Sequence, residues 1–140
     1  MMATAAKMTV VEVKPADNIG IKPDDTLSFL ECAMALNQDV IKNEKGELAG
    51  DPTETALIRY ISEKHTEQKL TEIQSKFPRI AEFPFDSDRK RMTTIHKFEG
   101  GYIAICKGAS EAVISVSKET QDAGKMLEKE AGKMAANGIR

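Results

Sequence analysis

The spacing of apolar residues predicts a helix near the start of the chain. Leu27, Leu30 and Met34 recur at intervals of three and four residues, which places their side chains on one face of a helix. We therefore expect a helix over residues 26–36, capped by the Asp that precedes it. A β-branched run over residues 8–13 indicates a short strand before this helix.

The sequence around Asp51 predicts the start of a second helix. Asp51 can cap it, Pro52 suits its first position, and Glu54 stands where a capping-box acid belongs. A third helix is expected over residues 67–76, and Pro78 ends it because proline cannot continue a helix.

Beyond residue 78 the apolar residues change from helical spacing to the short runs typical of strands, and helical spacing returns near residue 110. The expected elements are strands at 79–85, 92–98 and 102–107, followed by helices at 110–116 and 119–137. Gly100-Gly101 is expected at the turn of a hairpin, and residues 43–47 form a polar turn. Because helices and hairpin strands are grouped, the predicted fold class is α+β, an antiparallel β-sheet flanked by helices. Residues 1–140 have the length of a single domain.

Composition excludes several classes of function. The chain is 41% apolar and 30% charged, with a net charge of −2, so it can bury a core but offers no basic surface for nucleic acid. No apolar run reaches the ~18–20 residues of a membrane-spanning helix, and no direct membrane contact is expected. Cys32 and Cys106 lack the short spacing of metal ligands. They are expected to be reduced thiols, and a single disulfide is left open.

The segment from Phe83 to Met92 carries the most informative chemistry. Phe85 precedes a cluster of cations at residues 89–91, and an aromatic ring can stack on a nucleobase while cations hold its phosphates. The alternative is a core aromatic at the end of a strand. Pro84 before the ring and the polar residues after it favour the edge of a sheet, where a ring is half exposed.

Other polar residues stand at the ends of expected elements. Lys107 follows an apolar strand and precedes Gly108, a residue that permits close backbone approach and unusual φ. Lys90 lies at the start of the hairpin, and each lysine has the alternative of an ordinary solvated residue. Glu54 is either a capping acid alone or a carboxylate that accepts a hydrogen bond from the exocyclic amine of adenine.

The sequence carries no motif for catalysis or metal binding. It lacks the G-x-x-x-x-G-K-[ST] and G-x-G-x-x-G loops, and Ser110 lies outside any nucleophile elbow. His65 and His96 have no partner in the sequence and are expected at the surface or at a sheet edge. We therefore predict no catalytic residue and no metal ligand, and a stand-alone kinase or hydrolase fits poorly.

Four segments, taken in order, resemble the nucleotide-binding (N) domain of P-type cation-transporting ATPases, especially the calcium-pump branch. They are Gly50-Asp51-Pro52-Thr53-Glu54-Thr55-Ala56-Leu57, the run from Phe85 to Met92, Lys107-Gly108-Ala109-Ser110-Glu111, and Gly138-Ile139-Arg140. Their order and spacing match the family across the chain.

The resemblance implies a role for each matching residue. Phe85 would stack on adenine, and Glu54 would contact the adenine edge. Lys90 and Lys107 would line the pocket. Gly108 would let the pocket wall approach the base.

The resemblance also implies partners. Arg140 would reach toward the phosphates of ATP or ADP. The phosphorylation motif and the metal-binding segments of these pumps are absent, so this fragment of a larger membrane pump should bind nucleotide without being catalytic alone. Mg²⁺ is expected only with the missing phosphorylation domain. The expected partners are the phosphorylation and actuator domains of the same parent chain, on the cytosolic face of a membrane-embedded protein.

One departure keeps an alternative open. Ser87 stands where some calcium pumps carry an arginine, which weakens the expected contact with phosphate. The alternative function is a non-catalytic interaction or regulatory domain with a vestigial nucleotide pocket.

Overall fold

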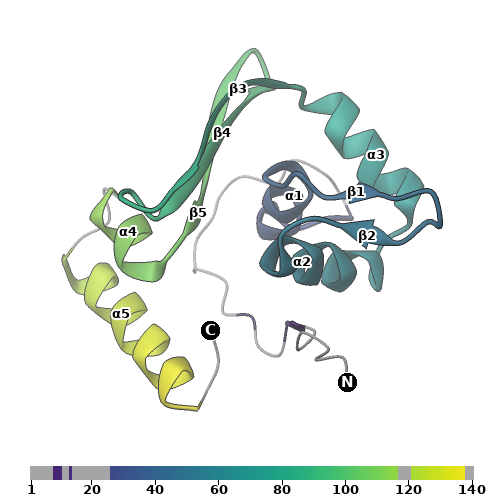
Figure 1. The fold of residues 1–140 in the computed structure, drawn as a ribbon. Helices are drawn as coiled ribbons and strands as arrows, with labels where there is room; N and C mark the ends of the chain where they lie inside the picture. Colours follow the sequence, from purple (N-terminus) through teal and green to yellow (C-terminus); the bar gives the residue numbers. More distant parts are fainter. Residues whose placement is uncertain (1–7, 11–12, 14–25, 117–120, 138–140) are drawn as a thin grey trace, which may run out of the picture. The chain divides into compact units, whose positions relative to one another are not determined.

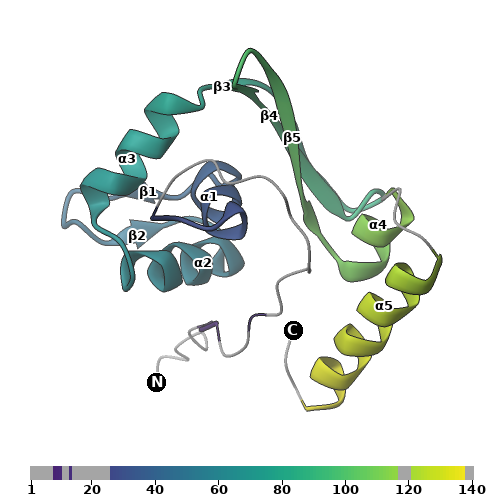
Figure 2. The ribbon, with the colours of Figure 1, turned by 180° about the vertical axis from the view of Figure 1, so that it is seen from behind.

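The fold is known from a computed structural model that describes residues 8–10, 13, 26–116 and 121–137. The chain divides into two compact units, residues 1–78 and 79–140. Figures 1 and 2 show their elements from two sides. The single domain over residues 1–140 stays a prediction.

The first unit packs three helices around one core. α1 (Phe29–Leu36) contacts both α2 (Pro52–Ser62) and α3 (Glu67–Lys76), and a small hairpin joins α1 to α2. Apolar side chains from all three helices and their flanks form the core: Leu27, Cys32, Ala35, Leu36, Ala56, Ile58, Ile61, Leu70, Ile73 and Phe77. Their helical spacing is why this half of the chain folds as helices.

α1 begins later than predicted, and Ser28 is its N-cap in place of an Asp. The Ser28 hydroxyl accepts from the backbone N–H of Glu31 at 3.1 Å, and a Glu31 carboxylate oxygen accepts from the Ser28 N–H at 3.0 Å. This capping box satisfies two helix-end donors together, which explains why the helix starts there.

The predicted start of α2 and the predicted bounds of α3 agree with those observed. Asp51 caps α2 by accepting from the Thr53 N–H at 2.9 Å and the Glu54 N–H at 3.4 Å. Thr66 caps α3 by accepting from the Lys69 N–H at 3.1 Å. α3 ends at Lys76, two residues before a proline, as predicted.

Two features of the first unit differ from the prediction. The polar turn at residues 43–47 connects strands β1 (Ile41–Lys42) and β2 (Leu48–Ala49), which are too short for a sequence pattern to reveal. The strand expected over residues 8–13 is wrong for the residues described there, which are not in a strand. A strand needs a neighbouring backbone, whereas the Met8 carbonyl accepts from the Arg59 side chain at 3.3 Å.

The second unit is built on a three-stranded antiparallel sheet in the order β3 (Arg79–Asp86), β4 (Arg91–Phe98), β5 (Gly101–Gly108). α4 (Ser110–Ser115) and α5 (Gln121–Ala136) follow it, and α4 contacts both β5 and α5. Two antiparallel sheets with helices confirm the α+β class (Figure 1). No helix in the described ranges is both long and apolar enough to cross a membrane.

The hairpin turn lies one residue earlier than predicted. Phe98 pairs with Gly101, so the two-residue loop is Glu99-Gly100 and Gly101 already belongs to β5. Both loop residues have positive φ, 43° and 79°, as a type I′ turn requires. This turn twists in the sense of the strands and therefore suits a tight hairpin.

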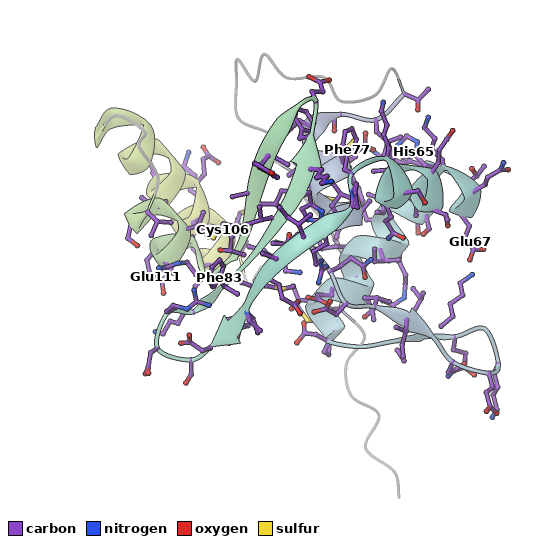
Figure 3. All side chains as sticks on the ribbon, turned by 90° about the horizontal axis from the view of Figure 1, so that it is seen from above. His65, Glu67, Phe77, Phe83, Cys106 and Glu111 are labelled. Atoms are coloured by element: carbon purple, nitrogen blue, oxygen red, sulfur yellow. The ribbon has the colours of Figure 1, made fainter. Side chains whose placement is uncertain are left out.

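The two histidines are less exposed than predicted. His96 is 1% exposed in β4, and its Nε2 lies 2.8 Å from the hydroxyl of Thr94, which is also buried. His65 is half-buried, and its Nε2 lies 3.0 Å from a Glu31 carboxylate oxygen (Figure 3 labels His65). Both rings form hydrogen bonds that the sequence pattern does not reveal.

The contact between Glu31 and His65 predicts how stability depends on pH. Burial raises the pKa of Glu31, but the hydrogen bonds from Ser28 and His65 outweigh it, and the net pKa lies below 4.5. A depressed folded-state pKa stabilises the fold above the unfolded-state pKa. The free energy of unfolding should therefore fall as pH decreases below 4.5, measured by urea unfolding.

A variant pair tests this assignment. Glu31→Gln should be less stable at neutral pH and should lose part of the acid dependence. The control is Glu72→Gln, because Glu72 pairs with Lys69 at 3.5 Å on the exposed side of α3. Identical pH profiles for the two variants would contradict the assignment.

Candidate functional site

One end of the three-stranded sheet gathers most of the predicted residues. Because the strands are antiparallel, the end of β3, the start of β4 and the end of β5 meet there. Asp86 pairs with Arg91, and Arg91 pairs with Gly108. The predicted residues at this end are Phe85, Lys90, Lys107 and Gly108.

Phe85 lies near the end of β3, an edge strand of the sheet. Its side chain is 60% exposed, and that of Phe83 is 51% exposed. Phe83, Thr93 and Cys106 form one row across the three strands (Figure 3 labels the first and last). The exposure fits the predicted half-exposed ring at a sheet edge and does not fit a core aromatic.

Asp86 closes the connection from β3 to β4. One carboxylate oxygen accepts from the backbone N–H of Asp88 at 2.9 Å and of Arg89 at 2.8 Å. The other accepts from the Arg89 Nε at 2.7 Å. The backbone and side-chain hydrogen bonds from Arg89 hold the pKa of Asp86 below its ordinary value of 3.8. Sequence reasoning missed this role, although an Asp that bonds to the backbone two residues later is a common turn device.

Lys90 stands at the junction of this loop with β4 and β5. Its φ is 55°, in the left-handed region. Its N–H donates to the Asp86 carbonyl at 2.8 Å, and its carbonyl accepts from the Ala109 N–H at 3.0 Å. Lys90 is exposed, and its ammonium makes no ion pair or hydrogen bond with any residue that the structure describes. The charge is therefore available to an anion from solution.

Lys107 and Gly108 end β5 at the same place. Lys107 is half-buried and lies opposite Met92, on the sheet face that also carries Thr94. A Cβ at Gly108 would lie 2.3 Å from the Lys90 carbonyl oxygen and 2.7 Å from the Arg91 Cα. The predicted close approach at Gly108 is therefore observed, and the approaching atoms belong to the backbone of Lys90 and Arg91. The left-handed φ that glycine also permits is not used there.

Glu54 belongs to the first unit. It is 8% exposed, and one carboxylate oxygen accepts from the Asp39 N–H at 2.9 Å. Glu54 thus connects α2 to the segment that follows α1. Its contact with adenine stays a prediction, and Arg140 lies outside the described residues.

One open hollow among the described residues lies away from the predicted site residues. It has a volume of about 500 Å³ and is open along one face of α3, lined by Glu67, Gln68, Thr71, Glu72 and Ser75. Its carboxylates would repel phosphate, so we do not assign the site there. Within the described ranges, no group of three or more His, Cys, Asp or Glu side chains could hold a metal ion.

The sequence pattern of the P-type ATPase cytoplasmic domain N matches residues 25–136. The chain belongs to this family. The matched range of the N domain includes Glu54, Phe85, Lys90, Lys107 and Gly108.

Several relatives of this N domain are calcium-transporting ATPases. Calcium-transporting ATPase 1 of Lactococcus lactis is 42% identical over 96 residues, which cover 69% of this chain and 11% of the relative. A calcium-transporting ATPase of Listeria monocytogenes is 36% identical over 120 residues, which cover 80% of this chain and 13% of the relative. The sodium/potassium-transporting ATPase subunit alpha-4 of Homo sapiens is 31% identical over 81 residues, 56% of this chain and 8% of the relative.

These matches confirm the predicted family, an N domain of a P-type cation ATPase that resembles calcium pumps. The chain spans 11% to 13% of the length of the two bacterial relatives.

The close approach at Gly108 predicts that a larger residue disrupts this end of the sheet. Gly108→Ala should lower the free energy of unfolding by about 1–3 kcal/mol, because backbone atoms must move to make room. Gly132→Ala in α5 is the control, since nothing lies within 4 Å of its added Cβ. Alanine there should stabilise the helix by about 1 kcal/mol. Equal effects of the two substitutions in urea unfolding would argue against the packing described.

Proposed function

We propose that this N domain binds ATP and ADP at the end of the β3–β5 sheet. The observation that carries the proposal is an exposed aromatic ring, Phe85, at the same sheet end as two lysines, Lys90 in the loop before β4 and Lys107 in β5. The ring offers a face on which adenine stacks. The ammonium groups of Lys90 and Lys107 attract the phosphates.

The proposed site binds the nucleotide, and the phosphoryl transfer takes place in another domain of the parent chain. Stacking and a few polar contacts hold the base, and the γ-phosphate projects toward the phosphorylation domain of the parent chain. That domain would supply the nucleophile and Mg²⁺, which stabilises charge on the phosphates. The chain's own residues therefore bind and orient the nucleotide without breaking a bond.

The parent protein in this proposal is a cation-transporting ATPase of calcium type. Its support is the similarity to calcium-transporting ATPases over most of this chain. The N domain would lie on the cytosolic side and meet the phosphorylation and actuator domains of the same chain. Transport itself would require segments other than this domain.

The first experiment is an ATP titration of the 140-residue chain, followed through backbone amide resonances. With stacking worth ~1–3 kcal/mol, we expect weak binding with a Kd on the order of 0.1–10 mM. Shifts should concentrate at residues 85–90 and 107–108. Saturation without shifts there would refute the site, and no binding at all would favour the alternative of a vestigial pocket.

Removal of the aromatic ring should abolish most of the affinity. Phe85→Ala should raise the Kd for ATP by about tenfold or more, because it removes the stacking surface. Its melting temperature should change little, since the ring is 60% exposed. Tyr102→Ala is the control: Tyr102 is 69% exposed at the other end of the same sheet. A large loss of stability with unchanged binding would identify Phe85 as a packing residue instead.

Magnesium should have little effect on the affinity of this chain for nucleotide. The described residues offer no carboxylate cluster to bind the ion, so Mg²⁺ would meet only the phosphates. Calorimetric titrations with ADP in Mg²⁺ and in a chelator should give Kd values within about threefold of each other. A much tighter complex with Mg²⁺ would mean that the chain itself contributes ligands to the metal.

A further inference from the structure

Arg89 makes contacts on both sides of Phe85. Its Nε donates to the Asp86 carboxylate at 2.7 Å, and its Nη2 donates to the Pro84 carbonyl at 2.7 Å. A longer contact of 3.5 Å joins Nη2 to the Phe83 carbonyl. The guanidinium therefore bridges the residue before Phe85 and the residue after it.

The strand needs such a bridge at this point. The register between β3 and β4 is irregular between Phe83 and Asp86, so the ladder does not fix the backbone there as a regular strand would. An arginine can donate in several directions at once because its guanidinium is a planar fork. Arg89 thus supplies hydrogen bonds to a backbone segment where regular pairing is interrupted.

Phe85 itself has little packing to hold it, with 60% of its surface exposed. A ring that moves freely must be ordered when a ligand stacks on it, and that ordering weakens binding. Ordering the backbone on both sides before the ligand arrives removes part of this cost. The contacts of Arg89 are suited to that purpose.

We infer that Arg89, held by Asp86, is a positioning residue that orders Phe85 for stacking on the nucleobase. The inference rests on the proposed function. It separates Arg89 from its neighbour in the cation cluster: Lys90 meets phosphate, whereas Arg89 uses its charge within the loop. A surface ion pair adds little to stability by itself, so the expected effect is on binding.

The test compares ATP with adenosine, which has no phosphate. Arg89→Ala should raise the Kd of both ligands by the same factor, about threefold to tenfold, the cost of ordering a side chain on binding. If Arg89 contacted phosphate directly, only ATP would bind more weakly, and that result would overturn the inference. Unchanged affinity for both ligands would overturn it as well.

Arg79 provides the matched control. Arg79 pairs with Glu82 at 3.0 Å through the same i,i+3 spacing, at the far end of β3. Arg79→Ala should leave both Kd values unchanged. Arg89→Lys keeps the positive charge but loses the planar guanidinium, so its affinity should lie between those of the unchanged chain and Arg89→Ala. If Arg89→Ala unfolds, Arg89→Lys takes its place in the test. Full recovery by lysine would show that charge alone suffices and would overturn the role of the bridge.

A measurement without nucleotide separates this inference from the proposed function. Heteronuclear NOE values of residues 84–90 report fast motion of the backbone. They should fall in Arg89→Ala and stay unchanged in Arg79→Ala. Equal values in the two variants would refute the ordering role. Failure of the unchanged chain to bind ATP or adenosine would refute the proposed function, whatever the NOE values are.

Discussion

The antiparallel pairing of β3, β4 and β5 is the constraint on which the candidate site depends. Phe85 and Lys90 are joined by the short loop between β3 and β4, whereas Lys107 and Gly108 are more distant in sequence and reach the same edge through the β4–β5 ladder. Two backbone hydrogen bonds of Lys90, one to Asp86 and one from Ala109, join the three ends directly. The absent side chain of Gly108 then allows the backbones to approach. Backbone contacts thus hold the three strand ends together at the candidate site.

The cations at this edge divide into two kinds. Arg89 is paired with a carboxylate at 2.7 Å and one third of its side chain is exposed, at 33%. Lys90 is exposed and makes no pair within the described part of the chain. The two adjacent cations therefore differ: the charge of Arg89 is paired within the loop, and the charge of Lys90 faces solvent. Counting positive charges along the sequence would overestimate the charge available to a ligand.

Local signals in the sequence were sufficient for most elements. Pro52 after a capping Asp and Pro78 after α3 mark a helix start and a helix end through backbone chemistry, and both are confirmed. The start of α1 was misjudged because Ser28 and Glu31 form a reciprocal cap, which outweighs an isolated Asp. The β1–β2 strands have two residues each and carry no periodic signal.

In the candidate site, too, some features follow from local sequence and others depend on contacts between residues far apart in the chain. The sequence motifs pointed to the sheet end because strand ends and turn residues are local features. The burial of His96 beside Thr94 and the hydrogen bond from Asp39 to Glu54 depend on tertiary packing. The bridge made by Arg89 was also missed, because side-chain direction in a loop does not follow from spacing. Residue roles that depend on such contacts require coordinates.

The two-residue turn at Glu99-Gly100 has a consequence at the opposite end of the hairpin. β4 and β5 pair without interruption from Phe98 and Gly101 to Arg91 and Gly108. The register that this short loop sets therefore continues without a bulge to the far edge, where Gly108 lies opposite Arg91. A different turn that shifted this register by one residue would move the β5 side chains to the opposite face of the sheet, so the remote loop helps to decide which face Lys107 occupies.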